Sequence, residues 1–293
     1  ALGAADAALD IAIQYAKERI QFGAPLSEKQ GYTHKLVVPH AVRVEAATAF
    51  MEEIAVRLDA GGKDLQVEGS IAKLFASEAA NQAADDAIQA LGGYGYIAEF
   101  EVEKIKRDVK ITCIYEGTSE IQQNIISTFR WKKTRKTKGE FYSALGMEME
   151  KLEASSGNLG CWLYATCAGM LNQIITLVHD NRLTRQQYIM FALADMMSHV
   201  EIGASLAKKA ASLTRSNAPE AEKHQIMSRL FAGEVAQLLS KNIPMILMGT
   251  NSFSTQDASD FLKQIDYDAL VAGQQGVLAD MDSMADILFE RVS

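Results

Sequence analysis

The chain has 293 residues, of which 48% are hydrophobic and 23% charged, and its formal net charge is −8. This length predicts two domains, and the acidic balance argues against general binding to nucleic acid. Three cysteines without disulfide or metal-ligand spacing are typical of a reducing compartment, so we expect a cytoplasmic protein.

The beginning of the chain indicates a fragment. No segment has the pattern of a signal peptide. The chain starts without Met, and its first residues already have helical spacing. We therefore expect a piece of a longer protein.

Four prolines and the absence of sustained alternation of β-branched residues predict an all-α fold. The first helix is expected to run to about Ile20, because a glycine and a proline follow it closely. A capping box over Ser27–Gln30 predicts the start of a second helix. That helix is expected to bend at Pro39 and to continue to residues 61–62.

A third helix is expected over residues 67–91 and ends at the glycine pair that follows. After a loop, a second capping box over Ser119–Gln122 predicts a fourth helix that runs to about Arg130. Four amphipathic helices with these connections predict a four-helix bundle over residues 1–132.

The segment RWKKTRKTK, residues 130–138, is basic at six of its nine positions. We interpret residues 133–139 as a solvated linker between domains. The alternative is a surface for an anionic partner, such as a membrane face or the phosphates of coenzyme A, with membrane contact expected to be weak. The charge-free stretch 154–178 is interrupted by polar residues, which favours a buried helix over a membrane span.

The second half repeats part of the first at a fixed offset. KLFASEAA at 73–80 matches RLFAGEVA at 229–236, and 229 − 73 = 156. Further ungapped matches at this offset predict that residues 140–293 form a second helical bundle, a degenerate repeat of the first. In this alignment Glu116 falls on Ala272, so the second copy lacks that carboxylate.

The candidate site is CIYEGTSEIQ, residues 113–122. Glu116 stands on a predicted turn just before a predicted helix. From the residues alone, it is either a solvated loop acid beside a capping box or a carboxylate held out for proton chemistry. The five histidines are scattered without ligand spacing, and we expect no metal site.

Three separated motifs resemble the C-terminal helical domain of the acyl-CoA dehydrogenases, the flavoproteins that desaturate fatty acyl-CoA thioesters. They are YAKERIQFG (15–23), QALGGYGY (89–96), and RDVKI (107–111) running into IYEGTSEIQ (114–122). Their order and spacing also fit, and the resemblance covers roughly residues 1–132. It implies a role in fatty-acid β-oxidation, with FAD as cofactor, acyl-CoA as substrate and an electron-transfer flavoprotein as partner.

The resemblance implies that Glu116 is the catalytic base. Desaturation removes a proton from the α-carbon and a hydride from the β-carbon, so a carboxylate must face the α-carbon on the side away from the flavin. Burial beside an acyl chain makes a carboxylate a stronger base. In the family, the backbone N–H of this residue binds the thioester oxygen, and the glycine matching Gly117 also contacts the thioester.

The resemblance also implies three groups of cofactor contacts. Thr118, Ser119 and Glu120 lie against the flavin at a helix N-terminus. Arg19 reaches the FAD pyrophosphate of a neighbouring subunit, accompanied by Ile20 and Gln21. The remaining contacts are made near the cofactor by Lys29 and Gln30, and along its adenosine half by Gln89, Ala90, Leu91, Gly92 and Gly93.

The family's dehydrogenases carry an N-terminal helical domain and a middle β-domain ahead of this bundle, and the chain has neither. We therefore expect the fragment alone to bind FAD weakly or not at all and to be inactive. The extension resembles the extra C-terminal domain of the very-long-chain type, and a copy that covers the apolar face of the bundle predicts a homodimer. The alternatives are an acyl-CoA oxidase and a non-enzymatic helical interaction module.

Overall fold

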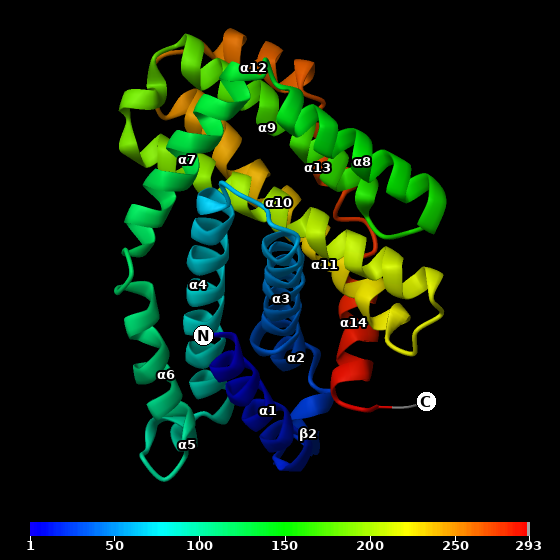
Figure 1. Cartoon of the computed structure of the whole chain (residues 1–293). Coiled ribbons are helices and arrows are strands. Elements are labelled where there is room, and N and C mark those ends of the chain that lie inside the picture. Colours follow the sequence, from blue (N-terminus) through cyan, green and yellow to red (C-terminus); the bar gives the residue numbers. More distant parts are fainter. Residues whose placement is uncertain (292–293) are drawn as a thin grey trace.

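The computed structural model describes residues 1–291, and these form an all-α structure, as predicted. Its only strands within that range are a short hairpin (Figure 1). The first half contains α1 (Leu2–Glu18), β1 (Ile20–Gln21), β2 (Ala24–Pro25), η1 (Leu26–Glu28), α2 (Gln30–Leu36), α3 (Val38–Asp59), α4 (Gln66–Leu91), α5 (Gly93–Tyr96), α6 (Val102–Lys110), η2 (Ile111–Cys113) and α7 (Ser119–Lys136). The second half contains α8 (Glu140–Ser156), α9 (Cys161–Asp180), η3 (Leu183–Arg185), α10 (Gln187–Arg215), α11 (Ala221–Met248), α12 (Thr255–Gln264), α13 (Asp268–Ala272) and α14 (Val277–Leu288).

The first half is a bundle in which α4 is the central helix. It packs against α1, α3, α6 and α7. Alanines line the contact between α1 and α4, and their small side chains let the two backbones approach closely. The fully buried alanines of this seam are Ala5, Ala8, Ala12, Ala16, Ala80, Ala83, Ala84 and Ala87.

The second half packs directly on this bundle. Helix α10 contacts α3 and α7, and α11 contacts α3 and α14, so that α10 and α11 lie across the bundle and contact α3 along much of its length (Figure 1). A single hydrophobic core extends from Ala5 in α1 to Phe289, just past α14. The three cysteines are buried and free.

The element bounds correspond between the halves at the offset of 156. Adding 156 to the bounds of α4 gives 222–247, and α11 covers 221–248. The same shift carries α2 and α3 onto the single helix α10. Pro39, in the first turn of α3, has Asp195 as its counterpart, so nothing prevents α10 from continuing there. These correspondences support the predicted repeat, while the division into domains at residues 132 and 140 stays a prediction.

Three details of the predicted helices are wrong. The first helix ends at Glu18, and a two-residue hairpin follows, in which Phe22 and Gly23 both have positive φ, as a type I′ turn requires. Ser27 does not cap α2, whose N-cap residue Lys29 makes no side-chain capping bond. The second predicted helix is divided at Val37, before Pro39, rather than bent.

The basic segment is mostly helical. Helix α7 continues to Lys136, six residues beyond the predicted end, and only residues 137–139 form the turn to α8. Arg130 is buried, and its guanidinium donates to the Glu201 carboxylate at 2.8 and 2.7 Å and lies 3.2 Å from Glu68. The basic residues from Lys132 onward are exposed. The first residue of the segment therefore joins α7 to α10 and α4.

Two helices of the second half, α9 and α10, are long and apolar enough to cross a membrane by length and composition. Within their most apolar windows, 56% of the α9 residues and 83% of the α10 residues are buried inside the molecule. Core helices of soluble proteins have the same properties, so the structure agrees with the prediction of a buried helix for the charge-free stretch.

Candidate functional site

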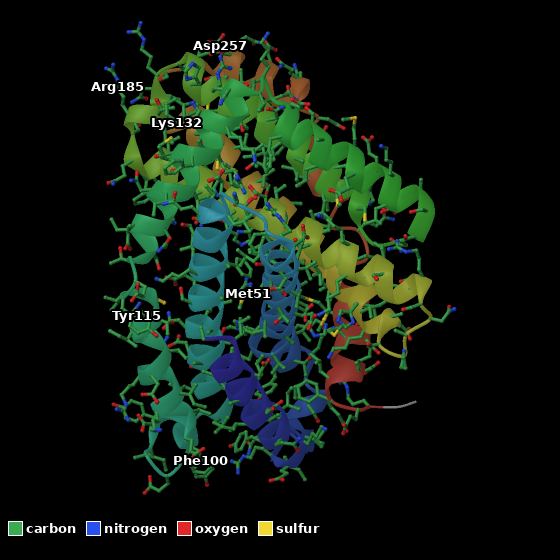
Figure 2. The ribbon with its side chains drawn as sticks, viewed as in Figure 1. Met51, Phe100, Tyr115, Lys132, Arg185 and Asp257 are labelled. Carbon is green, nitrogen blue, oxygen red and sulfur yellow. The ribbon has the colours of Figure 1, made fainter. Side chains whose placement is uncertain are left out.

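Glu116 lies on the turn between η2 and α7. It has a left-handed backbone conformation, with φ of 53°, and Gly117 follows with φ of 87°. Its side chain is exposed. Figure 2 places Tyr115, the preceding residue, on the outer flank of the molecule. A left-handed conformation costs a residue with a Cβ atom about 1–2 kcal/mol, so other contacts must hold it.

Side chains from two helices hold this turn. Gln122 in α7 donates from Nε2 to the Glu116 carbonyl at 2.9 Å, and Lys73 in α4 donates from Nζ to the Gly117 carbonyl at 2.7 Å. Gln122 is buried. A Cβ atom at position 117 would lie 2.7 Å from Nε2 of Gln122, so the glycine is required both by its φ and by this contact.

The backbone N–H of Glu116 makes no hydrogen bond with any other group in residues 1–291. Around the turn, four large apolar side chains are about half exposed: Ile111 48%, Ile114 50%, Tyr115 52% and Ile121 51%. The described part of the chain therefore presents a carboxylate and a free N–H donor within an apolar surface.

The capping box predicted at Ser119–Gln122 does not form, because the helix begins one residue earlier and its third residue is Ile121, which has no acceptor to return the bond. The N-cap of α7 is Thr118, whose hydroxyl accepts from the Ile121 N–H at 3.4 Å. Ser119 is the first helical residue, and its hydroxyl donates to Glu78 in α4. Hydrogen bonds from its own backbone N–H and from Thr118 hold the pKa of Glu120 below its ordinary value.

A second group of predicted residues lies at one end of the bundle. The hairpin and α5 share this end in Figure 1, and the Tyr15 and Tyr94 rings meet edge to face at 6.2 Å. Arg19, Ile20 and Gln21 are exposed, and within residues 1–291 the Arg19 guanidinium has no hydrogen-bond or ion-pair partner. Phe100 marks the same end in Figure 2, away from Tyr115.

The segment from Gln89 to Gly93 ends α4 at this end of the bundle. Ala90 and Leu91 point into the core, so only their backbone can meet a ligand. Gly92 has φ of 61°, and a Cβ atom added at Gly92 or Gly93 would have nothing within 4 Å. The glycines thus leave an open backbone surface beside Arg19 and the hairpin.

Lys29 and Gln30 are engaged by other parts of the chain. Lys29 donates from Nζ to the Phe22 carbonyl at 3.3 Å, which ties it to the hairpin. Gln30 donates from Nε2 to Asp282 in α14 at 3.0 Å. Because 252 residues separate this pair, sequence reasoning did not find the contact.

Sequence reasoning also missed Lys73, Glu78 and the role of the Gln122 side chain. Lys73 and Glu78 belong to the stretch KLFASE, which in the sequence indicates only the repeat and no functional site. Both lie on α4 and contact the turn or the start of α7, but nothing local in the sequence indicates these partners. Within residues 1–291, no group of three or more His, Cys, Asp or Glu side chains could hold a metal ion.

Residues 1–129 match the family model of the acyl-CoA dehydrogenase C-terminal domain. An acyl-CoA dehydrogenase of Bacillus subtilis is 50% identical over 129 residues, which are 44% of this chain and 34% of that protein. A 3-(aryl)acrylate reductase of Clostridium sporogenes is 44% identical over 128 residues, 44% of this chain and 33% of that protein. The chain thus spans about a third of the length of these relatives.

The similarity in fold extends over both halves. The crystal structure of a Bacillus anthracis acyl-CoA dehydrogenase complexed with FAD superimposes with a TM-score of 0.74 at 21% identity, covering 99% of this chain and 54% of that one. A tomato acyl-CoA oxidase superimposes with a TM-score of 0.63 at 14% identity, covering 98% and 49%.

Both halves of the chain share their all-α fold with these acyl-CoA dehydrogenase and acyl-CoA oxidase structures. The match of residues 1–129 to the model of the acyl-CoA dehydrogenase C-terminal domain confirms the resemblance found in the sequence. The second half has the fold of the corresponding part of the Bacillus anthracis structure.

Proposed function

We propose that the chain is the C-terminal part of an FAD-dependent acyl-CoA dehydrogenase, which introduces a double bond between the α- and β-carbons of a fatty acyl-CoA. The observation that carries this proposal is the turn at Glu116. It presents a carboxylate and an unbonded N–H among half-exposed apolar side chains, on a backbone held in the left-handed region. A general base and an oxyanion donor are the two groups that removal of an α-proton requires.

Glu116 acts as the base in this proposal. Its carboxylate takes the α-proton and becomes a carboxylic acid, while the electron pair of the broken α-C–H bond forms the new double bond. The Glu116 N–H donates to the thioester oxygen and stabilises the negative charge that develops there. When bound, FAD supplies the acceptor for the β-hydride. Ile114, Tyr115 and Ile121 provide apolar surface that excludes water once substrate covers them.

The open end of the bundle suits part of an FAD molecule. The free Arg19 guanidinium can donate two parallel hydrogen bonds to a pyrophosphate. The backbone at Gly92 and Gly93 is open to a ligand. This end and the Glu116 turn lie in different parts of the molecule (Figure 2). The separation agrees with the expectation that Arg19 contacts the cofactor of a partner subunit, which makes a homodimer part of the proposal.

An electron-transfer flavoprotein is the electron acceptor that we propose. A relative from Acetobacterium woodii, 42% identical over 132 residues, is a subunit of a caffeyl-CoA reductase–Etf complex; the match covers 45% of this chain and 34% of that protein. Two of the relatives described are reductases, and the same carboxylate would donate the α-proton in the reverse direction.

The experiment uses the full-length protein with its upstream domains. Glu116→Gln should lower dye-coupled desaturation of acyl-CoA by at least about 10²-fold while flavin absorbance and fold are retained. Glu222→Gln is the matched control, since Glu222 is also exposed and lies in the first turn of α11, outside both site regions. Equal activity of the two variants would refute the proposal. Consumption of oxygen without an added acceptor would identify an oxidase instead.

A further inference from the structure

The Glu116 turn is held by side chains that approach it from outside the motif itself. The carbonyl of Glu116 accepts from Gln122 at 2.9 Å, and the carbonyl of Gly117 accepts from Lys73 at 2.7 Å. Each carbonyl fixes the plane of the peptide that follows it, so the two bonds together set the backbone of both residues. They thereby hold the chain directly after Glu116, the residue that carries the carboxylate.

We propose that Lys73 and Gln122 are positioning residues for the base, a proposal that rests on the function proposed above. Neither side chain reaches the reacting atoms, because each is directed at a backbone carbonyl. Their role is to keep the left-handed turn in one geometry while the carboxylate accepts the proton.

The surroundings of the turn indicate why two anchors are present. Cys113 contacts the Ser77 carbonyl at 3.5 Å, and Ser119 donates to Glu78, so α4 holds the chain on both sides of the turn. Between these points, the Gln122 and Lys73 bonds are the side-chain contacts that fix the backbone at residues 116 and 117. Nε2 of Gln122 occupies the space that a Cβ atom at position 117 would need, so the hydrogen bond from Gln122 depends on the glycine.

The test measures proton transfer apart from hydride transfer. An acyl-CoA whose β-carbon is replaced by sulfur keeps its α-protons but has no β-hydride to lose. In deuterated water, the holoenzyme exchanges the α-proton through the Glu116 carboxylate, and mass spectrometry follows the incorporation of deuterium. The rate of exchange reports how well the base is aligned, and KM and flavin content are measured alongside it.

In the full-length holoenzyme, Lys73→Met and Gln122→Leu should each slow exchange by about 10- to 100-fold, since displacement of a catalytic group by about 1 Å costs up to about 10²-fold. KM should change by less than about threefold, because the residues position the base rather than bind the substrate. Lys73→Arg should recover most of the rate, since a guanidinium still donates to the Gly117 carbonyl.

Lys106→Met is the matched control. Lys106 likewise donates from a helix to a backbone carbonyl of α4, that of Asn81 at 3.0 Å, but it lies away from the turn. It should exchange at the wild-type rate. In a Glu116→Gln background, Lys73→Met should cause no additional slowing, because its effect passes through the base.

The outcomes separate the two proposals. Wild-type exchange in Lys73→Met or in Gln122→Leu, or flavin loss in proportion to the lost rate, would overturn the positioning role while Glu116→Gln remains inactive. Wild-type exchange in Glu116→Gln would overturn the proposed function itself. The two positioning variants alter different helices, so either one decides the matter if the other does not fold.

Discussion

At the scale of single residues, Arg130 illustrates how much a charge depends on its surroundings. Only 3% of it is exposed, and it contacts Glu201 and Glu68, while the Tyr142 hydroxyl donates to Glu201 at 3.0 Å. Removing one member of a buried ion pair leaves the other charge uncompensated. The residue therefore matters for stability, although it lies in a basic segment typical of a solvated surface.

Arg130→Met should lower the free energy of unfolding of the 293-residue chain by about 3–5 kcal/mol, because Glu201 would be left buried without its cation. Urea denaturation followed by circular dichroism measures this loss. Arg135→Met is the control, since Arg135 pairs with Asp180 at 3.6 Å on the surface and should cost less than about 1 kcal/mol. Equal losses in the two variants would contradict the prediction.

The residues of the site were predictable where the motif is local. Glu116, Gly117 and the helix start were read directly from CIYEGTSEIQ. The contacts that hold the turn were not, because Lys73 is 44 residues from its acceptor and a lysine on a helix has no preferred partner in the sequence. The capping box predicted at Ser119 was wrong because Thr118 takes the N-cap position, and Glu78, 41 residues away, binds the Ser119 hydroxyl.

At the scale of helices, a titratable contact joins the two halves. His224 in α11 lies 3.1 Å from Glu45 in α3, and Lys209 in α10 lies 2.7 Å from the same carboxylate. Burial alone would lower the pKa of His224, but hydrogen bonds to Glu45 and to the Glu220 carbonyl outweigh it and raise the pKa. Burial would raise the pKa of Glu45, but His224 and Lys209 lower it, so the carboxylate stays ionised near neutral pH.

This contact predicts a specific pH dependence. The pKa of His224 is higher in the folded state than its ordinary value of 6.5, so its stabilisation is complete below that value and is lost as the pH rises through the raised pKa. The difference in unfolding free energy between wild type and His224→Gln should therefore be larger at pH 6 than at pH 8.5. A difference that is constant or grows with pH would show that the pair does not link the helices.

The helices themselves followed from periodicity, but their divisions depended on particular residues. The break at Val37 and the hairpin at Phe22 depend on the backbone conformation of single residues, which the spacing of apolar residues does not predict. Helix α7 continues past Arg130 because that residue is anchored by Glu201, 71 residues later, and because Lys133 lies over the Phe141 ring at 4.2 Å. Contacts with residues distant in the sequence thus stabilise the last turns of α7, where the run of basic residues had predicted a linker.

At the scale of the whole molecule, the second half covers the first. Helices α10 and α11 both pack on α3, and one core continues through the two halves. Their correspondence with α2–α3 and α4 at the 156-residue offset supports an attached copy that occupies a bundle surface. Such a copy would replace contacts that bundles of separate chains could make with each other.

The full-length protein should therefore be a dimer. Light scattering should give twice the mass of one chain. Solution X-ray scattering should fit two subunits, each with the Arg19 end of its bundle against the other subunit. Helices α10 and α11 already occupy one side of α3, so the bundle of another chain could not pack on that side. A tetramer joined bundle to bundle would contradict this account.

The central claim is that Glu116 is a base whose catalytic surroundings are completed by the rest of the protein. The most direct measurement is the exchange of an α-proton into deuterated water by the full-length enzyme, with the sulfur-substituted acyl-CoA described above. The account predicts rapid exchange in the wild type, and loss of exchange in Glu116→Gln with flavin still bound. Exchange at the wild-type rate in that variant would show that another group removes the proton.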